Sequence, residues 1–262
     1  MLAASWTDLA DELARWRDAG KLVEFWWRDD DAGAQSASLR RLISLASSAG
    51  VPLALAAVPA DAERAALANL PPAVTVIQHG ADHRNRAAGG EKKTEFPPSE
   101  PVDLALERLV AGRKKLEGAA GGPVLTVLAP PWNRISTALA ARLAGAGYRG
   151  LSRFGVRKVT LPGAAPTEVN THVDIIDWHG RRGFCGTAQA LGEAVRHLAS
   201  RRLGESDAAE PTGWLTHHAV HDEQCWDFLE KLFDSTRMNA GVAWLAPAKV
   251  FEIESGSKST PA

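Results

Sequence analysis

The chain of 262 residues has few cysteines, no excess of charge and no long apolar run. Its two cysteines, Cys185 and Cys225, are too few for a disulfide framework and form no CxxC pair. The formal net charge is -1, so the charge balance does not favour a nucleic-acid or anionic-membrane partner. No segment approaches the about 20 apolar residues of a membrane span, and the N-terminus lacks the features of a signal peptide. We therefore expect a cytoplasmic protein.

Aromatic residues are unevenly used, with nine tryptophans against one tyrosine. Tryptophan can form the stacking wall of a sugar site, but we favour the hydrophobic core for most of these side chains. Hydrophobic residues make up 45% of the chain and charged residues 23%, which is typical of a globular protein with a sizeable core. The length suits one α/β barrel.

Short apolar runs alternate with amphipathic stretches, which predicts repeated β-then-α units. Strands are expected at residues 22–27, 52–58, 74–78, 124–128, 149–152, 172–176, 214–216 and 242–245, the last of which would close a barrel. Helices are expected at residues 8–18, 36–49, 60–70, 101–116, 136–147, 186–203 and 222–234. We expect one domain over residues 1–255 and a disordered tail over residues 256–262.

An acid run, Asp29, Asp30 and Asp31, follows the apolar run 23–27. Like charges this close repel each other, so the run is costly unless a cation or an arginine such as Arg28 offsets it. Aspartate is also a favoured helix N-cap, which makes a solvated loop the competing interpretation. The preceding strand favours a functional role, because α/β barrels build their sites at the C-terminal ends of strands.

Two histidines, His79 and His83, follow another predicted strand. Their spacing puts both on one face of a helical turn, where they can share one metal ion. The HxxxH pair alone is weak evidence, but an acid run after an earlier strand strengthens it. Two imidazoles and one carboxylate leave positions open on zinc, or on a similar divalent ion, for water and a substrate oxygen.

The segment Ala129-Pro130-Pro131-Trp132-Asn133 also follows a predicted strand. Two prolines stiffen the backbone, so a rigid structural turn is the simplest interpretation. A stiff turn also fixes the direction of the Trp132 backbone N–H, as an oxyanion site would need.

Two further clusters combine acids and histidines at strand ends. Asp174 and Asp177 follow one strand, and His217 and His218 follow another. A histidine oriented by a buried carboxylate is a natural general acid near neutral pH. The other histidines lack such a context and are interpreted as structural or surface residues, namely His172, His179, His197 and His221.

Taken in order, these clusters resemble the motifs of the polysaccharide deacetylase family, also called the NodB-homology or carbohydrate esterase family 4 proteins. The acid run is similar to the family's acid pair ending in glycine, and His79 with His83 matches its HxxxH motif. The Arg-Pro-Pro-Tyr motif is similar to Ala129-Pro130-Pro131-Trp132, the Asp-Trp motif to Asp174 and Asp177-Trp178, and the Leu-x-His motif to Leu215-Thr216-His217. Each motif is weak alone, but five in order form a specific signal.

The resemblance implies a distorted (β/α) barrel of about seven strands and metal-dependent removal of an acyl group from an N-acylated amino sugar or glycan. It implies that Asp29 is the general base and that Asp30, His79 and His83 hold a divalent metal ion, for which zinc is the expected identity. His217 would protonate the leaving amine, helped by Asp174 or Asp177, and Trp132 would bind the oxyanion. Neighbouring residues assigned to substrate binding are Pro131, Asn133 and Trp178.

Three departures from the family pattern leave alternatives open. Ala129 replaces the family arginine, for which Arg28 or Arg134 could substitute. Asp31 replaces the glycine, so the acid pair could instead be Asp30 and Asp31. His218 competes with His217, although alternation along a strand allows only one of them to face the site. Without a secretion signal, an intracellular glycan, a lipid-linked sugar precursor or another N-acyl compound is expected as substrate.

Two other functions compete with a sugar deacetylase. One is a hydrolase of the same fold that cleaves a non-sugar amide or another C–N bond, because fold alone does not fix the substrate. The other is a catalytically inactive, glycan-binding module, which the missing arginine favours and the retained acids and histidines oppose.

Overall fold

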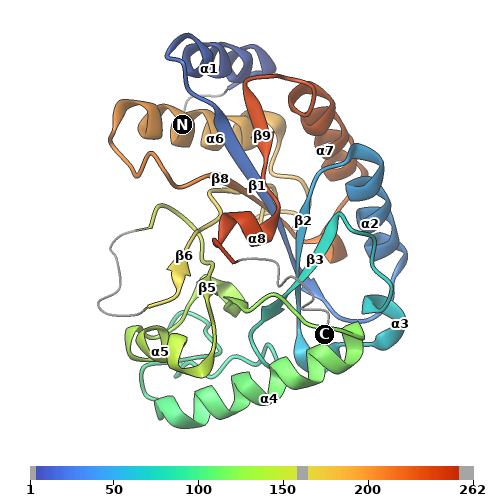
Figure 1. The fold of residues 1–262 in the computed structure, drawn as a ribbon, viewed down its shortest axis with the longest axis vertical. Coiled ribbons are helices and arrows are strands. Elements are labelled where there is room, and N and C mark those ends of the chain that lie inside the picture. The colour runs from blue at the N-terminus through green and yellow to red at the C-terminus, as the bar shows by residue number, and fades with distance from the viewer. Residues whose placement is uncertain (1–3, 158–164, 254–262) are drawn as a thin grey trace, which may run out of the picture.

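In the computed structural model, which describes residues 4–157 and 165–253, helices surround a curled sheet of parallel strands (Figure 1). The strands are β1 Val23–Ala32, β2 Leu53–Ala57, β3 Val74–His79, β4 Val127–Ala129, β5 Gly150–Leu151, β6 Thr167–Glu168, β7 Val173–Asp174, β8 Thr212–Thr216 and β9 Val242–Trp244. Their order is β6-β5-β4-β3-β2-β1-β8-β7, and β9 pairs with the start of β1. The expected α/β fold is confirmed as a distorted half-barrel.

Eight α-helices and four short 3₁₀ helices are assigned in the described ranges. The α-helices are α1 Trp6–Asp18, α2 Ala37–Ala49, α3 Arg64–Leu67, α4 Val102–Ala120, α5 Thr137–Arg142, α6 Thr187–Leu203, α7 Glu223–Thr236 and α8 Pro247–Val250. The 3₁₀ helices are η1 Pro59–Asp61, η2 Pro131–Asn133, η3 Ala144–Ala146 and η4 His218–Val220. None of the described helices has the length and apolarity that a membrane crossing requires.

Local sequence explains where the longer helices begin and end. Ser5 and Asp8 form a reciprocal capping box at the start of α1, and Ser36 caps α2 through its hydroxyl. Gly50 ends α2 with a φ of 64°, a left-handed conformation that glycine adopts without steric cost. Asp222 caps α7 by accepting the Cys225 N–H. These caps supply partners for backbone groups that the helices leave unpaired.

Strand β1 lies in the middle of the sheet and contributes to two separate hydrophobic clusters. Phe25 and Trp27 pack with the helices outside the curl, whereas Trp26 packs inside it with β2, β3, β4 and α8. Alanines at positions 54 and 56 leave room inside for the Trp26 ring, which meets Phe251 edge-on. Successive side chains of a strand face opposite sides, so Arg28 and Asp30 share the inner face with Trp26.

Several expected elements differ from the observed ones. The strand expected over 242–245 does not close the barrel, because β9 pairs with residues 23–25 of β1 rather than with an edge strand. The helix expected over 60–70 is divided into η1 and α3, and the one over 136–147 into α5 and η3. Strand β1 continues to Ala32, so the acid run lies within the strand rather than after it. The predicted tail, 256–262, lies outside the described residues.

Candidate metal and catalytic site

The ends of β1 and β3 bring Asp31, His79 and His83 together. One oxygen of Asp31, Oδ1, lies 3.2 Å from Nε2 of each histidine, and the three side chains form a group able to hold a metal ion. Burial alone would raise the pKa of Asp31, but the two imidazoles outweigh it and hold that pKa below its usual range. Asp31 and His83 are each about one-third exposed, so the group opens to solvent.

The hydrogen bonding of His79 suits a metal ligand. Its Nδ1 lies 3.0 Å from the Ala129 carbonyl oxygen, which can only accept, so Nδ1 carries the proton. With Nδ1 committed to this bond, His79 presents Nε2 to Asp31, and Nε2 is the nitrogen available to a metal ion that displaces its proton. An imidazole whose second nitrogen donates to a carbonyl is the usual arrangement around protein-bound metals.

Asp30 does not join this group but pairs with Arg28, and both side chains are buried. Arg28 Nε lies 2.9 Å from Asp30 Oδ1, and Arg28 Nη2 donates to Oδ2 at 3.0 Å. The three remaining guanidinium N–H groups donate to Ser152 Oγ at 2.7 Å, to Asn133 Oδ1 at 2.6 Å and to the Arg153 carbonyl at 3.3 Å. The geometry therefore disfavours Asp30 as the metal ligand. It favours the alternative register, in which Asp30 and Asp31 form the acid pair of the family motif.

Asp29, expected to be the base, points away from the metal group. It is fully buried on the outer face of β1, where it accepts the Thr216 hydroxyl at 2.6 Å and the His218 N–H at 3.0 Å. Its other oxygen pairs with His218 Nδ1. Burial would lower the pKa of His218, but the Asp29 carboxylate outweighs burial and raises it. The expectation of Asp29 as base is not supported, because its oxygens are hydrogen-bonded to Thr216 and His218, away from the triad of Asp31, His79 and His83.

A bulge explains why Asp31 turns inward although it shares a parity with Asp29. The pairing of β1 with β2 shifts register between Asp29 and Ala32, and Asp31 has a φ of 68°. A left-handed residue at a bulge rotates the chain that follows it. Asp30 and Asp31 thus both reach the inner side of the sheet end.

His217 lies between two acids at the end of β8. Its Nε2 is 3.9 Å from Asp30 Oδ2, and its Nδ1 is 4.0 Å from Asp174 Oδ1. Trp178 packs edge-on against the imidazole and donates from Nε1 to Asp174 at 2.8 Å. Burial raises the pKa of Asp174. Asp177 instead accepts the N–H groups of residues 179 and 180 in a turn, so only Asp174 faces His217.

The segment 129–133, with its two prolines, lies beside the triad of Asp31, His79 and His83. Trp132 packs against His83 with ring centroids 4.5 Å apart and ring planes tilted by 49°, and it adopts a φ of 55° within η2. Asn133, at φ 57°, directs its side chain to Arg28. Pro131 is buried against the loop that carries the two histidines, and it leaves no space for a side chain at Gly80. The segment therefore supports both the histidine loop and the guanidinium.

Sequence reasoning missed two side chains that complete this arrangement and left the assignment of a third open. Ser152 and Glu95 lie in stretches without a recognisable motif, and Arg28 was only one of two candidates for the missing arginine. The other candidate, Arg134, donates to the Lys93 carbonyl and makes no contact with Asp30 among the hydrogen bonds of the described residues. A positive charge is expected beside three consecutive acids, and that signal identifies Arg28.

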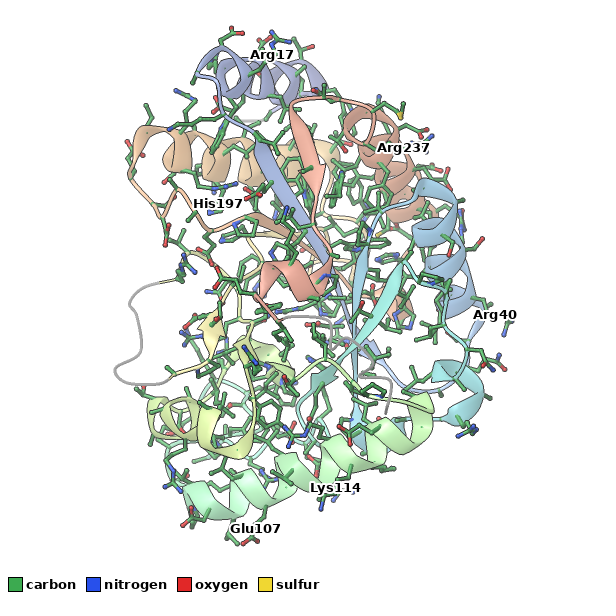
Figure 2. All side chains as sticks on the ribbon, in the orientation of Figure 1. Arg17, Arg40, Glu107, Lys114, His197 and Arg237 are labelled. Carbon is green, nitrogen blue, oxygen red and sulfur yellow. The ribbon has the colours of Figure 1, made fainter. Side chains whose placement is uncertain are left out.

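A second group of metal-ligating residue types lies in the core, formed by His172, His197 and Glu210. The two imidazoles stack with centroids 3.5 Å apart, and His172 Nε2 lies 3.4 Å from Glu210 Oε2. All three side chains are buried, and the label of His197 in Figure 2 marks the place below α6. The expectation that His172 and His197 are structural is consistent with this position.

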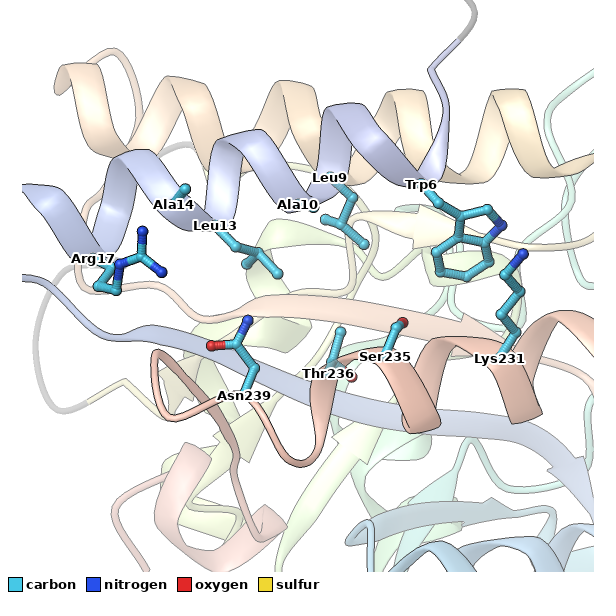
Figure 3. Close-up of a pocket in the computed structure, with 10 residues that line it drawn as sticks. All are labelled: Trp6, Leu9, Ala10, Leu13, Ala14, Arg17, Lys231, Ser235, Thr236 and Asn239. Carbon is cyan, nitrogen blue, oxygen red and sulfur yellow. The ribbon is translucent and has the colours of Figure 1, made fainter.

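A cavity of about 300 Å³ lies between α1 and α7 (Figure 3). Leu9 and Leu13 of α1 face Ser235 and Thr236 across it, and its only charged lining residues are Arg17 and Lys231. No acid or histidine is among its described lining residues, so the carboxylate and imidazole groups gathered at the strand ends have no counterpart there.

No family model and no curated protein sequence matches the chain. Solved structures share its fold. A putative polysaccharide deacetylase from Mycobacterium smegmatis is 13% identical with a TM-score of 0.59, and the match covers 96% of this chain and 93% of that one. A family 4 acetyl xylan esterase from Clostridium thermocellum, in complex with a cobalt ion, is 12% identical with a TM-score of 0.51, covering 88% and 91%.

The protein Puue allantoinase, 11% identical, superposes with a TM-score of 0.61 over 88% of this chain and 89% of that one. At these identities the likeness concerns the fold alone, which is that of the polysaccharide deacetylases and acetyl xylan esterases. The substrate has to be argued from the site.

Proposed function

We propose that the chain is a metal-dependent hydrolase that removes an acyl group, acetyl in the simplest case, from an N-acylated amino sugar or related glycan. The observation that carries this proposal is the triad of Asp31, His79 and His83 flanked by Asp30 and His217. Those five side chains are the minimum set for hydrolysing an amide with a metal, a base and an acid.

In this proposal Asp31, His79 and His83 hold one divalent ion, and zinc suits two imidazoles and a carboxylate. Such an ion polarises the acyl carbonyl and lowers the pKa of water at its open positions. The cobalt ion in the fold-related acetyl xylan esterase supports a metal in this kind of site.

Asp30 is proposed as the general base, in place of Asp29. Its carboxylate takes the proton of the attacking water, and Arg28 fixes its orientation through two contacts of about 3 Å. Arg28 thereby fills the position left by Ala129 in the family pattern. The guanidinium comes from the same strand as the base, two residues away, and Ser152 and Asn133 hold it in place.

His217 is proposed as the general acid. An unprotonated amine leaves poorly, so the nitrogen of the substrate must gain a proton as the C–N bond breaks. Asp174 faces His217 Nδ1 and Trp178 packs against its ring, which orients Nε2 toward Asp30 and the triad. The Trp132 N–H is proposed to bind the charge that develops on the carbonyl oxygen.

Activity of the zinc-loaded protein on a panel of N-acetylated amino sugars and their oligomers tests this function. Release of acetate by the wild-type chain, and none by Asp31→Asn, is the expected result. Cleavage of non-sugar amides with no reaction on any sugar would favour the second function, which the fold shared with Puue allantoinase keeps open. Metal binding without hydrolysis of either class would favour a glycan-binding module.

A further inference from the structure

The loop that carries His83 has a backbone that needs external support. Gly80 has a φ of 60° and His83 a φ of 54°, both in the left-handed region. For a residue with a side chain, such as His83, this conformation is sparsely populated and persists where surrounding contacts impose it. Some neighbouring group therefore holds residues 80–83 in place.

That group is Glu95, whose side chain is fully buried. Its Oε1 accepts the N–H of Ala81 at 3.0 Å and of Asp82 at 3.2 Å, and its Oε2 accepts the N–H of His83 at 3.2 Å. Three consecutive backbone N–H groups thus converge on one carboxylate. Such a concave row of donors is an anion-binding arrangement, and here the anion belongs to the chain itself.

The space around this carboxylate is fully used. A Cβ on Gly80 would lie 2.1 Å from Glu95 Oε2 and 2.6 Å from the Pro131 ring, so only glycine fits there. Arg86 forms an ion pair with Asp82 at 2.6 Å and lies 3.9 Å from Glu95 Oε1, which partly offsets the buried charge. The loop therefore closes around Glu95 with little freedom to adjust.

We infer that Glu95 is a positioning residue for the metal site: it fixes the backbone of residues 81–83 so that His83 Nε2 meets Asp31 beside His79. The inference rests on the proposed function in so far as the triad binds a metal. Glu95 contacts no reacting group, so its effect is on metal affinity rather than on proton transfer.

Glu95→Gln is the variant that tests this. The amide keeps the size of the side chain but offers one acceptor oxygen, and its NH₂ group must face at least one backbone N–H. Loss of an outer partner of a metal ligand typically weakens metal affinity by about 10–100-fold. We expect the Kd for Zn²⁺ to rise by that factor, and the absorption of bound Co²⁺ to change as its ligand geometry changes.

Glu210→Gln is the matched control. Glu210 is a buried glutamate that also accepts backbone N–H groups, from Asn170 at 2.9 Å and Arg157 at 3.3 Å, but it does not touch the triad. Both variants should lower the melting temperature, whereas only Glu95→Gln should weaken Zn²⁺ binding. Titrations use a competing chelator, with Asp31→Asn as the baseline for binding outside the triad.

An unchanged Kd in a folded Glu95→Gln protein, or an equal loss in Glu210→Gln, overturns the inference. If Glu95→Gln does not fold, Glu95→Asp is the test in its place. Aspartate keeps the charge, but its shorter side chain cannot reach all three backbone N–H groups. A folded Glu95→Asp protein with wild-type affinity would also overturn the inference, and weakened affinity supports it. A wild-type chain that binds no Zn²⁺ at the triad defeats the proposed function itself, which is a distinguishable result.

Discussion

Among the described residues, two groups combine two histidines with one carboxylate, and they differ in the hydrogen-bond partners of their ring nitrogens. In the first group, a carbonyl oxygen faces His79 Nδ1, so Nε2 is free to bind a metal. In the second, the Gly213 N–H donates to His172 Nδ1 at 3.0 Å, so the proton of the neutral ring is on Nε2 and faces Glu210. A metal at His172 Nε2 would displace that proton and oppose the Gly213 donor.

Access differs between the two groups as well. Asp31 and His83 are about one-third exposed at a strand end, whereas His172, His197 and Glu210 are enclosed beneath α6. Arg201 adds a positive charge beside the second group, where it donates to Thr212, the hydroxyl that also contacts His197. Residue types alone therefore do not define a metal site, because the partner of the second ring nitrogen decides whether a histidine can ligate.

Removing one carboxylate from each group is the strongest test of the difference between them. Asp31→Asn should abolish Zn²⁺ binding at the triad and hydrolysis with it, because a ligand is lost outright. Glu210→Gln should leave Zn²⁺ binding at the triad and hydrolysis unchanged for each folded molecule. Isothermal titration of each variant with Zn²⁺ checks this, and a loss of the tight site in Glu210→Gln would invert the assignment.

The same titration separates Asp30 from Asp31. Asp30→Asn should keep the metal and lose turnover, whereas the opposite pattern would restore Asp30 as the ligand.

His217→Ala should lower kcat by about a hundredfold to ten-thousandfold, the usual effect of one acid–base group, with metal binding intact. His218→Ala removes the partner of buried Asp29 instead, so it should destabilise the fold while the folded molecules keep their turnover. Steady-state kinetics and thermal unfolding of both variants measure the two effects. A fully active His217→Ala beside an inactive His218→Ala contradicts the assignment.

Arg28→Lys sharpens the contrast between residues that bind the metal and residues that orient the base. Lysine keeps the charge but lacks the planar fork that contacts Asp30, Ser152 and Asn133 together. We expect kcat to fall by about 10–100-fold, with KM and Zn²⁺ affinity nearly unchanged. Arg134→Lys, at the rejected candidate for this role, is the control and should be fully active.

Much of the fold followed from the sequence because its signals are local. Apolar runs marked the central strands, and amphipathic stretches marked the long helices α1 and α2. The short strands β5 and β7 lie within the predicted strands 149–152 and 172–176, whereas β6 was not predicted, because a two-residue strand has no periodicity to detect. For the same reason the pairing of β9 with β1 was not predictable.

At the site, the clusters were identified but the register of the acid run was not. Residues 25–27 are apolar on both faces of β1, so their pattern does not reveal which parity faces inward. The bulge at Asp31 then breaks the alternation altogether. Glu95 escaped detection because its partners are backbone N–H groups twelve to fourteen residues away, which leave no mark on side-chain sequence.

The smallest expected effect is a pH dependence of stability that belongs to the buried group. Burial lowers the pKa of His197 from its ordinary 6.5 to about 2. As pH falls below 6.5 the unfolded chain takes up a proton at His197 that the folded chain does not, so stability present at neutral pH is progressively lost. The slope for one such group reaches about 1.4 kcal/mol per pH unit.

His197→Phe keeps a ring against His172 and loses the contact with Thr212, which costs about 1 kcal/mol at pH 8. The variant should therefore be less stable than wild type at pH 8 but lose stability less steeply toward pH 5, so that the gap narrows as the solution becomes acidic. Denaturant unfolding at pH 8, 7, 6 and 5 measures this, with the exposed His179→Gln as the control. Parallel pH curves for His197→Phe and wild type would show that the buried pair takes up protons in the folded state, and the contrast drawn between the two histidine groups would then fail.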